Sequence, residues 1–155
     1  MKEDQSMYTN ALDEQFGEIL KRINPAKRRE YAKKVSVALR AHRSNEILAN
    51  RNADGSDMEP RKSSKKRRQK NKNSKMFQKM GRRRSLRIKA NSNFASVGFQ
   101  NRNKGLASIH HYGRTIRVNQ YGTRVKYPER TMIGIGKAEE EIIMNQFYEL
   151  VEGAF

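Results

Sequence analysis

The stretch SLRIKANSNFASVGF, residues 85–99, decides the fold. Apolar residues alternate with polar ones in both of its halves: Leu86, Ile88 and Ala90, then Ala95, Val97 and Phe99. This period of two is typical of half-buried antiparallel strands, and the polar residues 91–93 between the halves predict a turn. The stretch is therefore expected to form a β-hairpin.

A second hairpin is expected in TIRVNQYGTRVKYPER, residues 115–130. Its apolar residues would face each other across a turn at residues 121–122: Ile116 and Val118 on one strand, Val125 and Tyr127 on the other. Between the hairpins, residues 105–113 fit a short helix that is apolar on one side. The two hairpins together predict a small antiparallel sheet of about four strands.

Helices are expected on both sides of this sheet. Residues 8–23 carry apolar side chains at three- and four-residue steps, which is typical of an amphipathic helix. Asn24-Pro25 ends that helix and starts a second one at about residues 26–50, because Asn caps helices well and Pro suits the first helical position. The side chains expected on the buried stripe of the second helix are Tyr31, Val35, Ala38, Leu39 and His42.

The last helix is expected over residues 137–152. Its first turn carries three carboxylates at residues 139–141, which suit the positive end of the helix dipole. An acidic C-terminal helix beside a basic sheet would also let copies join head to tail in a ring, and both explanations of these carboxylates remain open. The overall prediction is an α+β fold, with two N-terminal helices and one C-terminal helix packed on the sheet.

At 155 residues the chain is expected to form a single domain, residues 1–155, with a modest core. Only 35% of the residues are apolar, against roughly 45–50% in average globular proteins. Four parts are predicted within the domain: a helical pair at 8–50, a basic flexible loop at 51–75, a sheet region with short helices at 76–136 and the C-terminal helix at 137–152.

The charge is strongly positive, with a formal net charge of +18. No acidic residue lies between Glu59 and Glu129, so the sheet is expected to be electropositive. Residues 61–75, RKSSKKRRQKNKNSK, have no apolar side chain that could offset the cost of ordering them. The candidate residues for contact with a partner or with DNA are Arg61, Lys62, Lys65, Lys66, Arg67, Arg68, Lys70, Lys72, Lys75, Arg82, Arg83 and Arg84.

Two interpretations of this basic run remain open. It can contact nucleic-acid phosphates without sequence specificity, through counterion release. Alternatively, it is a solvated loop that orders only against an acidic protein, or not at all. Aromatic residues that would stack on single-stranded bases are missing from the run.

Several classes of site are excluded or disfavoured. The chain has no cysteine, which excludes disulfides and thiolate sites, and no apolar run approaches the roughly 20 residues of a membrane span. The first residues lack signal-peptide character, so we expect a soluble protein in the cytoplasm where it is made. No nucleophile elbow, phosphate-binding glycine loop or HExxH motif is present.

His110-His111 is the one pair that suggests an enzyme or a metal. Adjacent side chains on a helix point roughly 100° apart, so the pair would not chelate one ion together. The acidic residues around Asp54, Asp57 and Glu59 do not have the spacing of an EF-hand loop. We therefore expect no catalytic residue, no metal and no cofactor, and packing or a subunit contact for the histidines.

Five motifs follow one another in a suggestive order: NRNADGSDMEPRK, KMF, SLRIKANSNFASVGF, IHHYG and VKYPERTMIGI. Together they resemble the phage virion morphogenesis, or tail completion, proteins of Mu-like and related contractile-tailed phages. The motif positions are Asp54, Gly55, Phe77, His110, His111, Tyr112, Gly113, Tyr127, Pro128 and Arg130. The sequence departs from the pattern in its denser basic run and at Gly136-Lys137, where the family has a Ser or Asp that starts the last helix.

The resemblance implies structural work at the head-proximal end of the tail: tail completion, termination or head–tail joining. The implied partners are further copies in a ring around the DNA channel (a hexamer is one option), tail tube or sheath proteins, and head-connector proteins. It also implies a place in the virion neck after assembly in the host cytoplasm. The basic segment 61–89 adds the hypothesis that this part faces either the DNA in the channel, through non-specific contact, or an acidic neighbouring ring. No membrane partner is expected, because the chain has no long apolar run. The alternatives are a basic nucleic-acid-binding protein and, third, a metal-dependent nuclease.

Overall fold

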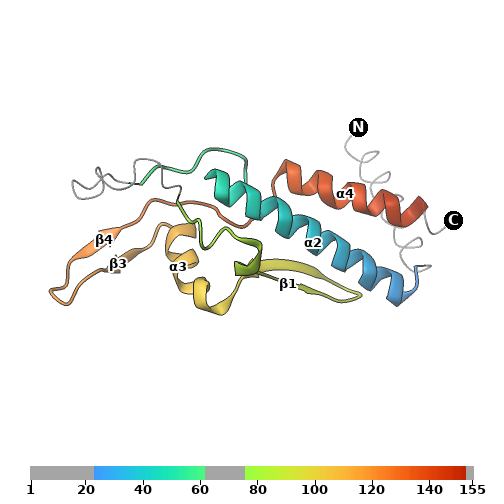
Figure 1. Ribbon diagram of the computed structural model, residues 1–155, viewed down its shortest axis with the longest axis horizontal. Helices are drawn as coiled ribbons and strands as arrows, with labels where there is room; N and C mark the ends of the chain where they lie inside the picture. Colours follow the sequence, from blue (N-terminus) through green and yellow to red (C-terminus); the bar gives the residue numbers. More distant parts are fainter. Residues whose placement is uncertain (1–22, 62–75, 153–155) are drawn as a thin grey trace, which may run out of the picture.

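The computed structural model describes residues 23–61 and 76–152, and the α+β class is confirmed (Figure 1). The predicted helix at 8–23, except its last residue, and residues 62–75 of the basic loop lie outside the described residues. The described elements are α2 (Pro25–Ala49), the short 3-10 helix η2 (Arg83–Ser85), β1 (Leu86–Ala90), β2 (Ala95–Phe99), α3 (Asn101–His111), β3 (Thr115–Arg117), β4 (Arg124–Lys126) and α4 (Lys137–Glu152).

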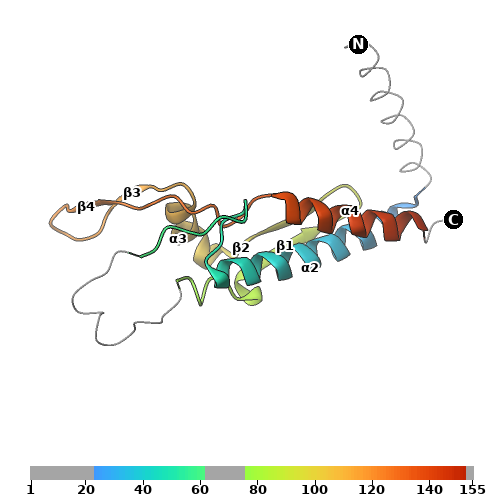
Figure 2. The ribbon, with the colours of Figure 1, turned by 90° about the horizontal axis from the view of Figure 1, so that it is seen from above.

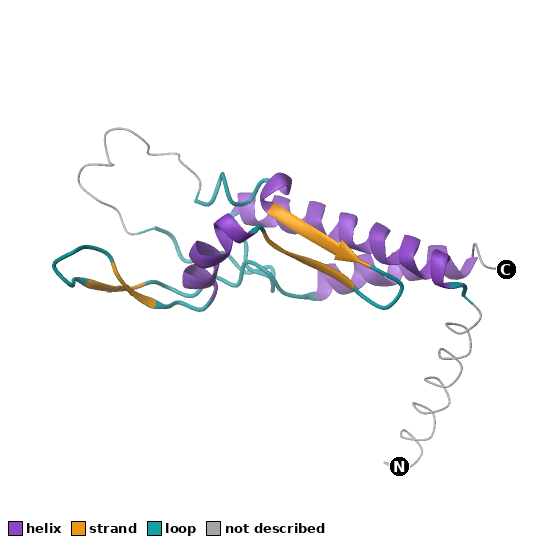
Figure 3. Ribbon diagram, turned by 90° about the horizontal axis from the view of Figure 1, so that it is seen from below, coloured by secondary structure: helices purple, strands orange, loops and turns teal. Residues whose placement is uncertain are grey.

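The 25-residue helix α2 is the centre of the body. It starts as predicted, because the Asn24 side chain accepts a hydrogen bond from the Ala26 N–H at 2.6 Å and Pro25 occupies its first turn. It ends at Asn50, which adopts the left-handed conformation. Helix α4 runs antiparallel along one side of α2, and the β1–β2 hairpin lies along another (Figures 1 and 3).

The structure confirms the β1–β2 hairpin that the alternating pattern predicted. Leu86 pairs with Phe99 and Ile88 with Val97, and these side chains face the helix layer, whereas Arg87 and Lys89 point outward and are exposed. The turn is stabilised by the side chain of Asn91, whose Oδ1 accepts from the Asn93 and Phe94 N–H groups. A strand period of two thus places the apolar half of each strand on α2.

The four strands do not form one sheet, which corrects the prediction of a single four-stranded sheet. In the described part of the chain, β1 pairs with β2 and β3 pairs with β4, and the two hairpins are separate sheets. Helix α3 stands between them, and β3 and β4 have only three residues each (Figure 1). Alternating apolar residues identify strands but do not tell which hairpins join edge to edge.

The core is rich in methionine. Its buried members come from six separate parts of the chain: Ile47, Met58, Met76, Met80, Leu86, Ala107 and Met132. Methionine is flexible and fills irregular gaps, which suits a core where loops as well as helices and strands meet. The buried side of α2 is also wider than predicted, because α4 and the hairpin both cover it: Ala32, Val35, Ser36, Arg43, Ser44 and Ile47 are buried, and Tyr31, Ala38, Leu39 and His42 are half-buried.

Candidate functional site

Arg130, from the Tyr-Pro-x-Arg motif, is buried and holds three segments together. Its Nε donates to the Glu59 carbonyl at 2.8 Å, and its Nη2 lies 3.4 Å from the Pro60 carbonyl. Its Nη1 lies 3.2 Å from Nδ1 of His110, and its backbone N–H donates to the His110 carbonyl at 2.8 Å. The guanidinium therefore connects the segment after β4 to α3 and to the loop before residue 61.

Aromatic rings surround this guanidinium. The His110 ring meets Phe77 and Tyr127 edge to face, with centroids 4.9 Å apart in both pairs, and the Arg130 guanidinium lies 5.8 Å from the Phe77 ring centroid. Burial lowers the pKa of His110, and the positive charges of Arg130 and Arg61 lower it further. A neutral imidazole can accept a hydrogen bond from Arg130 through Nδ1. Phe77, His110, Tyr127 and Arg130 are called the Arg130 cluster below.

Phe77 and Gly113 shape the backbone around the Arg130 cluster. Phe77 has a φ of 59°, a left-handed conformation that is costly for a bulky residue. Gly113 has a φ of 58°, and a Cβ there would lie 3.0 Å from the Glu129 nitrogen and 3.1 Å from the Tyr127 carbonyl oxygen. The end of α3 thus packs directly on the backbone around Pro128, which only glycine permits.

A cavity of about 630 Å³ opens beside this cluster. Apolar side chains such as Met76, Leu106 and Val125 line it, together with Phe77, Arg61 and Arg130. The motifs KMF, IHHYG and VKYPERTMIGI, which are far apart in sequence, therefore meet at one place in the fold.

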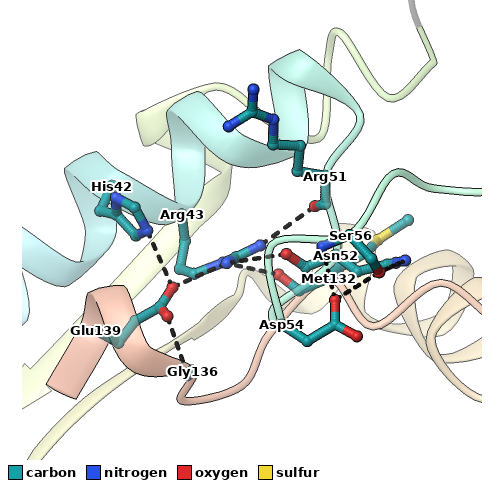
Figure 4. A network of polar contacts seen from close by, with 9 residues as sticks. All are labelled: His42, Arg43, Arg51, Asn52, Asp54, Ser56, Met132, Gly136 and Glu139. Atoms are coloured by element: carbon teal, nitrogen blue, oxygen red, sulfur yellow. Dashed lines mark hydrogen bonds and ion pairs between the residues drawn. The ribbon is translucent and has the colours of Figure 1, made fainter.

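A second cluster lies in the joint between α2 and α4 (Figure 4). Arg43 Nη1 lies 2.8 Å from Glu139 Oε1, and both side chains are almost completely buried. The Arg43 guanidinium also donates to the Met132 carbonyl at 3.3 Å and reaches the carbonyls of Arg51 and Asn52 at longer distance. His42 Nε2 is 3.3 Å from the same Glu139 oxygen.

Glu139 also caps α4. Its Oε2 accepts from the Gly136 N–H at 3.0 Å, which is the carboxylate half of a capping box. This contact satisfies the Gly136 N–H, but Gly136 has no side chain that could accept from the N–H groups in the first turn of α4. Burial alone would raise the pKa of Glu139, but the hydrogen bonds from Arg43 and Gly136 outweigh it and hold the pKa below its ordinary value.

The Asp54-Gly55-Ser56 turn packs against this second cluster. Asp54 Oδ1 accepts from the Ser56 N–H at 2.9 Å and from its hydroxyl, and these bonds lower the pKa of Asp54. The neighbouring Ala53 N–H donates to the Thr131 carbonyl at 2.7 Å. A Cβ at Gly136 would come within 2.3 Å of the Ala53 carbonyl oxygen, so this turn and the entry to α4 fit closely together.

The structure separates His111 and Tyr112 from the Arg130 cluster. The His111 ring meets Tyr112 edge to face at 4.6 Å, and the Arg114 guanidinium lies 5.2 Å from the exposed Tyr112 ring. His110 and His111 thus have different neighbours. Within residues 23–61 and 76–152, no group of three or more His, Cys, Asp or Glu side chains is placed to hold a metal ion.

The basic residues fall into two groups. Arg61, Arg82, Arg83 and Arg84 are exposed, whereas Lys62, Lys65, Lys66, Arg67, Arg68, Lys70, Lys72 and Lys75 lie outside the described residues. The contacts predicted for both groups stay predictions. As for membranes, the helices of the described part are all too short or too polar to span a bilayer.

Sequence reasoning missed Arg43 and Glu139. A signal existed, because Arg43 lies four residues before the buried Ile47 and seven after the buried Ser36, in the middle of the buried stripe. Glu139 stands three residues after Gly136, which is the spacing of a capping box. Charged residues on predicted helices are usually solvated, and the carboxylates at 139–141 were explained by the helix dipole or a contact between copies, so the buried pair was not expected.

Comparison with known proteins gives two matches. The Phage virion morphogenesis family matches residues 7–152 of this chain. The chain is also 25% identical over 127 residues to Tail completion protein S of Escherichia phage P2, which covers 81% of this chain and 85% of that protein. No solved structure matches significantly. The chain therefore belongs to the phage virion morphogenesis family.

Proposed function

We propose that this protein is a structural subunit that completes the phage tail at the end that meets the head. It acts there as one member of a ring around the DNA channel, beside tail tube or sheath proteins and head-connector proteins. In this proposal it is made in the host cytoplasm, remains in the virion neck and converts no substrate. Membership of the phage virion morphogenesis family supports a role in phage assembly. The name of the P2 relative supports tail completion in particular.

One structural observation supports a building block in particular. In the Arg130 cluster, Arg130 is directed at His110 and at backbone carbonyls. In the buried pair, Arg43 is directed at Glu139 and at a backbone carbonyl, and Glu139 also accepts from a backbone N–H. Their hydrogen bonds connect segments that are far apart in sequence. Such contacts fix the loops in one conformation. This suits a ring subunit, which has to keep its conformation while it binds its neighbours.

The exposed cations favour a second role for the same body. Arg61 and Arg82 to Arg84 lie on either side of the undescribed part of the basic loop, and all four are exposed. We propose that the segment 61–89 faces either the DNA in the channel or an acidic neighbouring ring. A high-resolution map of the assembled neck with this segment on the outer wall would exclude both.

Electron microscopy of particles made without the protein tests the main proposal. We expect filled heads and separate tails that do not join, or tails with an unfinished upper end, and rescue by the wild-type gene. A tagged copy should appear at the head–tail junction. Normal infectious particles without the protein, or a tag at the baseplate end, would overturn the proposal.

The competing function is non-specific nucleic-acid binding, which the exposed cations and the net charge of +18 favour. A duplex binder should lose affinity steeply with salt, because each neutralised phosphate contributes about 0.9 to the slope of log affinity against log salt. Fluorescence anisotropy with a labelled duplex measures this slope. A steep slope together with normal phage assembly in the absence of the protein would favour the competing function.

A further inference from the structure

The β3–β4 hairpin projects from the body as an arm (Figures 1 and 2). We define this arm as residues 114–126. Near its tip, Tyr121 is 84% exposed and Val118 is 45% exposed. A two-stranded ribbon with large exposed apolar side chains is only marginally stable alone, so such an arm suits a contact with a partner.

The charges of the arm point to an anionic partner. Arg117 and Arg124 are directly opposite each other in the register, and Lys126 follows on the same face. Like charges directly opposite destabilise a hairpin, and the arm contains no acidic residue that could compensate them. Arg117 does donate to the carbonyls of Asn119 and Gln120 in the turn, whereas Arg124 and Lys126 are exposed.

Helix α4 carries a complementary surface. Glu140, Met144, Tyr148 and Glu152 follow one another at four-residue steps and therefore form one stripe. All four are exposed, with Met144 at 43% and Tyr148 at 57%. Glu141, Asn145 and Glu149 form the next stripe and are also exposed. We call these two stripes the α4 outer face, which has an apolar centre and acidic ends.

The arm and the α4 outer face lie at different ends of the molecule. Figures 1 and 2 show the arm extending from one end, while α4 runs alongside α2 to the other end. The arm therefore cannot contact the α4 outer face of its own copy. A neighbouring copy can provide this contact, because its α4 offers carboxylates for Arg124 and Lys126 and apolar side chains for Tyr121 at the tip of the arm.

We propose that the arm of one copy docks on the α4 outer face of the next copy, which rests on the proposed function as a ring subunit. Such a contact is heterologous, and repeating it closes a ring when the rotation per copy fits. Contacts between two arms or between two α4 outer faces would bring like charges together and are disfavoured. DNA would match the cations of the arm but would leave its Tyr121 without an apolar partner.

Disulfide trapping tests this contact, because the natural chain has no cysteine. Tyr121→Cys protein is mixed with Met144→Cys protein under mild oxidation, and in assembled tails both substitutions are placed in one chain. We expect a covalent heterodimer in the mixture and a ladder of covalent oligomers in the tails. The matched control replaces Tyr121→Cys by Asn93→Cys, an exposed position in the β1–β2 turn. Trapping no stronger than this control, in solution and in tails, would overturn the contact.

Charge reversal gives a second test. Arg124→Glu with Lys126→Glu should weaken association of copies at least about tenfold, because like charges would then face each other across the interface. Glu140→Lys with Glu141→Lys should do the same, and combining all four substitutions in one chain should restore association. The control is Arg29→Glu with Lys33→Glu, two exposed positions on α2 that reverse the same number of charges. Failure of the combined variant to recover, or an equal loss in the control, would contradict the docking.

The outcomes of these tests show whether the proposed interface or the proposed function is wrong. If the protein sits at the head–tail junction but the cysteine pair does not crosslink there, the arm contact is wrong and the ring-subunit role survives. If particles form without the protein, the proposed function fails whatever the crosslink shows. If the arm variants lose duplex binding but keep association of copies, the arm is a DNA contact and the proposed docking is refuted.

Discussion

At the residue scale, the pair of Arg43 and Glu139 determines how α4 is held against α2. Both side chains are nearly completely buried, and each also binds backbone groups. Removing one member of a buried ion pair leaves an uncompensated charge, which typically costs about 3–5 kcal/mol. We therefore predict that Arg43→Met lowers the free energy of unfolding by about this amount, measured by urea denaturation.

The matched control is Lys34→Met, which breaks the exposed pair of Lys34 and Glu30 at 3.3 Å. An exposed pair on one helix is worth only about 0.3–0.5 kcal/mol, so this variant should stay close to wild type. The double variant Arg43→Met with Glu139→Leu should lose less than the sum of the two single variants, because it leaves no unpaired charge. An Arg43→Met protein as stable as Lys34→Met would contradict the assignment.

His110 makes the stability depend on pH near neutrality. Its pKa is lowered by burial and by the charges of Arg130 and Arg61, so the folded state binds a proton less readily than the unfolded state. Stability is then complete above the ordinary histidine pKa of about 6.5 and falls as the pH drops below it. We predict that His110→Gln, which cannot titrate, reduces this fall in the unfolding free energy between pH 7 and 5.

The comparison of slopes isolates this effect from other titrations. His111→Gln makes the same substitution at the neighbouring histidine, which lies outside the Arg130 cluster, and serves as the matched control. Both variants are unfolded in urea at several pH values. The same slope for wild type and His110→Gln would show that His110 contributes no such dependence.

These residue contacts show what the sequence could and could not predict. The motif positions Phe77, His110, Tyr127 and Arg130 were singled out together by resemblance, and the fold brings them within one cluster. Nothing local in the sequence indicated that cluster, since its members come from the turn at Phe77, from α3 and from the segment after β4. The burial of Arg43 depends on α4 arriving from about a hundred residues away, so α2 alone could not reveal it.

At the scale of elements, the glycine at the end of α3 decides how α3 meets the segment after β4. Gly113 has a φ of 58° and no room for a Cβ against the Glu129 and Tyr127 backbone. The left-handed conformation alone costs an L residue about 1–2 kcal/mol, and the close contact adds to it. We predict that Gly113→Ala destabilises the protein by at least that amount in thermal or urea unfolding.

Gly105→Ala, inside the helix that Gly113 follows, is the control. Gly105 lies inside α3, and a Cβ there would meet no atom within 4 Å. Alanine in a helix interior is favoured over glycine by about 0.5–1 kcal/mol, so this variant should be slightly more stable than wild type. If the two variants changed stability in the same direction, the close packing of Gly113 would be in doubt.

Elements were more predictable than their arrangement. The cap at Asn24-Pro25 and the alternation from Leu86 to Phe99 are local signals, and α2 and the β1–β2 hairpin follow them closely. Pairing between hairpins is not local, and the expected single sheet is in fact two. Helix α3 starts at Asn101 rather than near Gly105, because a polar first turn gives no apolar period to detect.

At the scale of the whole molecule, two electrostatic effects on association oppose each other. The net charge of +18 repels copies over long distances, whereas the arm and the α4 outer face attract at contact. The Debye length is about 30 Å at 0.01 M salt, about 8 Å at 0.15 M and about 3 Å at 1 M. Moderate salt therefore screens the long-range repulsion first, and high salt is needed to weaken charges that touch.

We accordingly predict that association of copies strengthens as salt rises from about 0.01 to about 0.15 M and weakens again toward about 1 M. Analytical ultracentrifugation of the full chain measures the association of copies over both salt ranges. The variant with Arg124→Glu and Lys126→Glu should lose the weakening at high salt, because it has no attractive pairs left to screen. If association of the wild type instead falls steadily from the lowest salt, the attraction between contacting charges outweighs the long-range repulsion at every salt concentration. A steady rise to the highest salt would mean instead that apolar contacts alone hold the copies together, and the acidic ends of the α4 outer face would then have no part in their association.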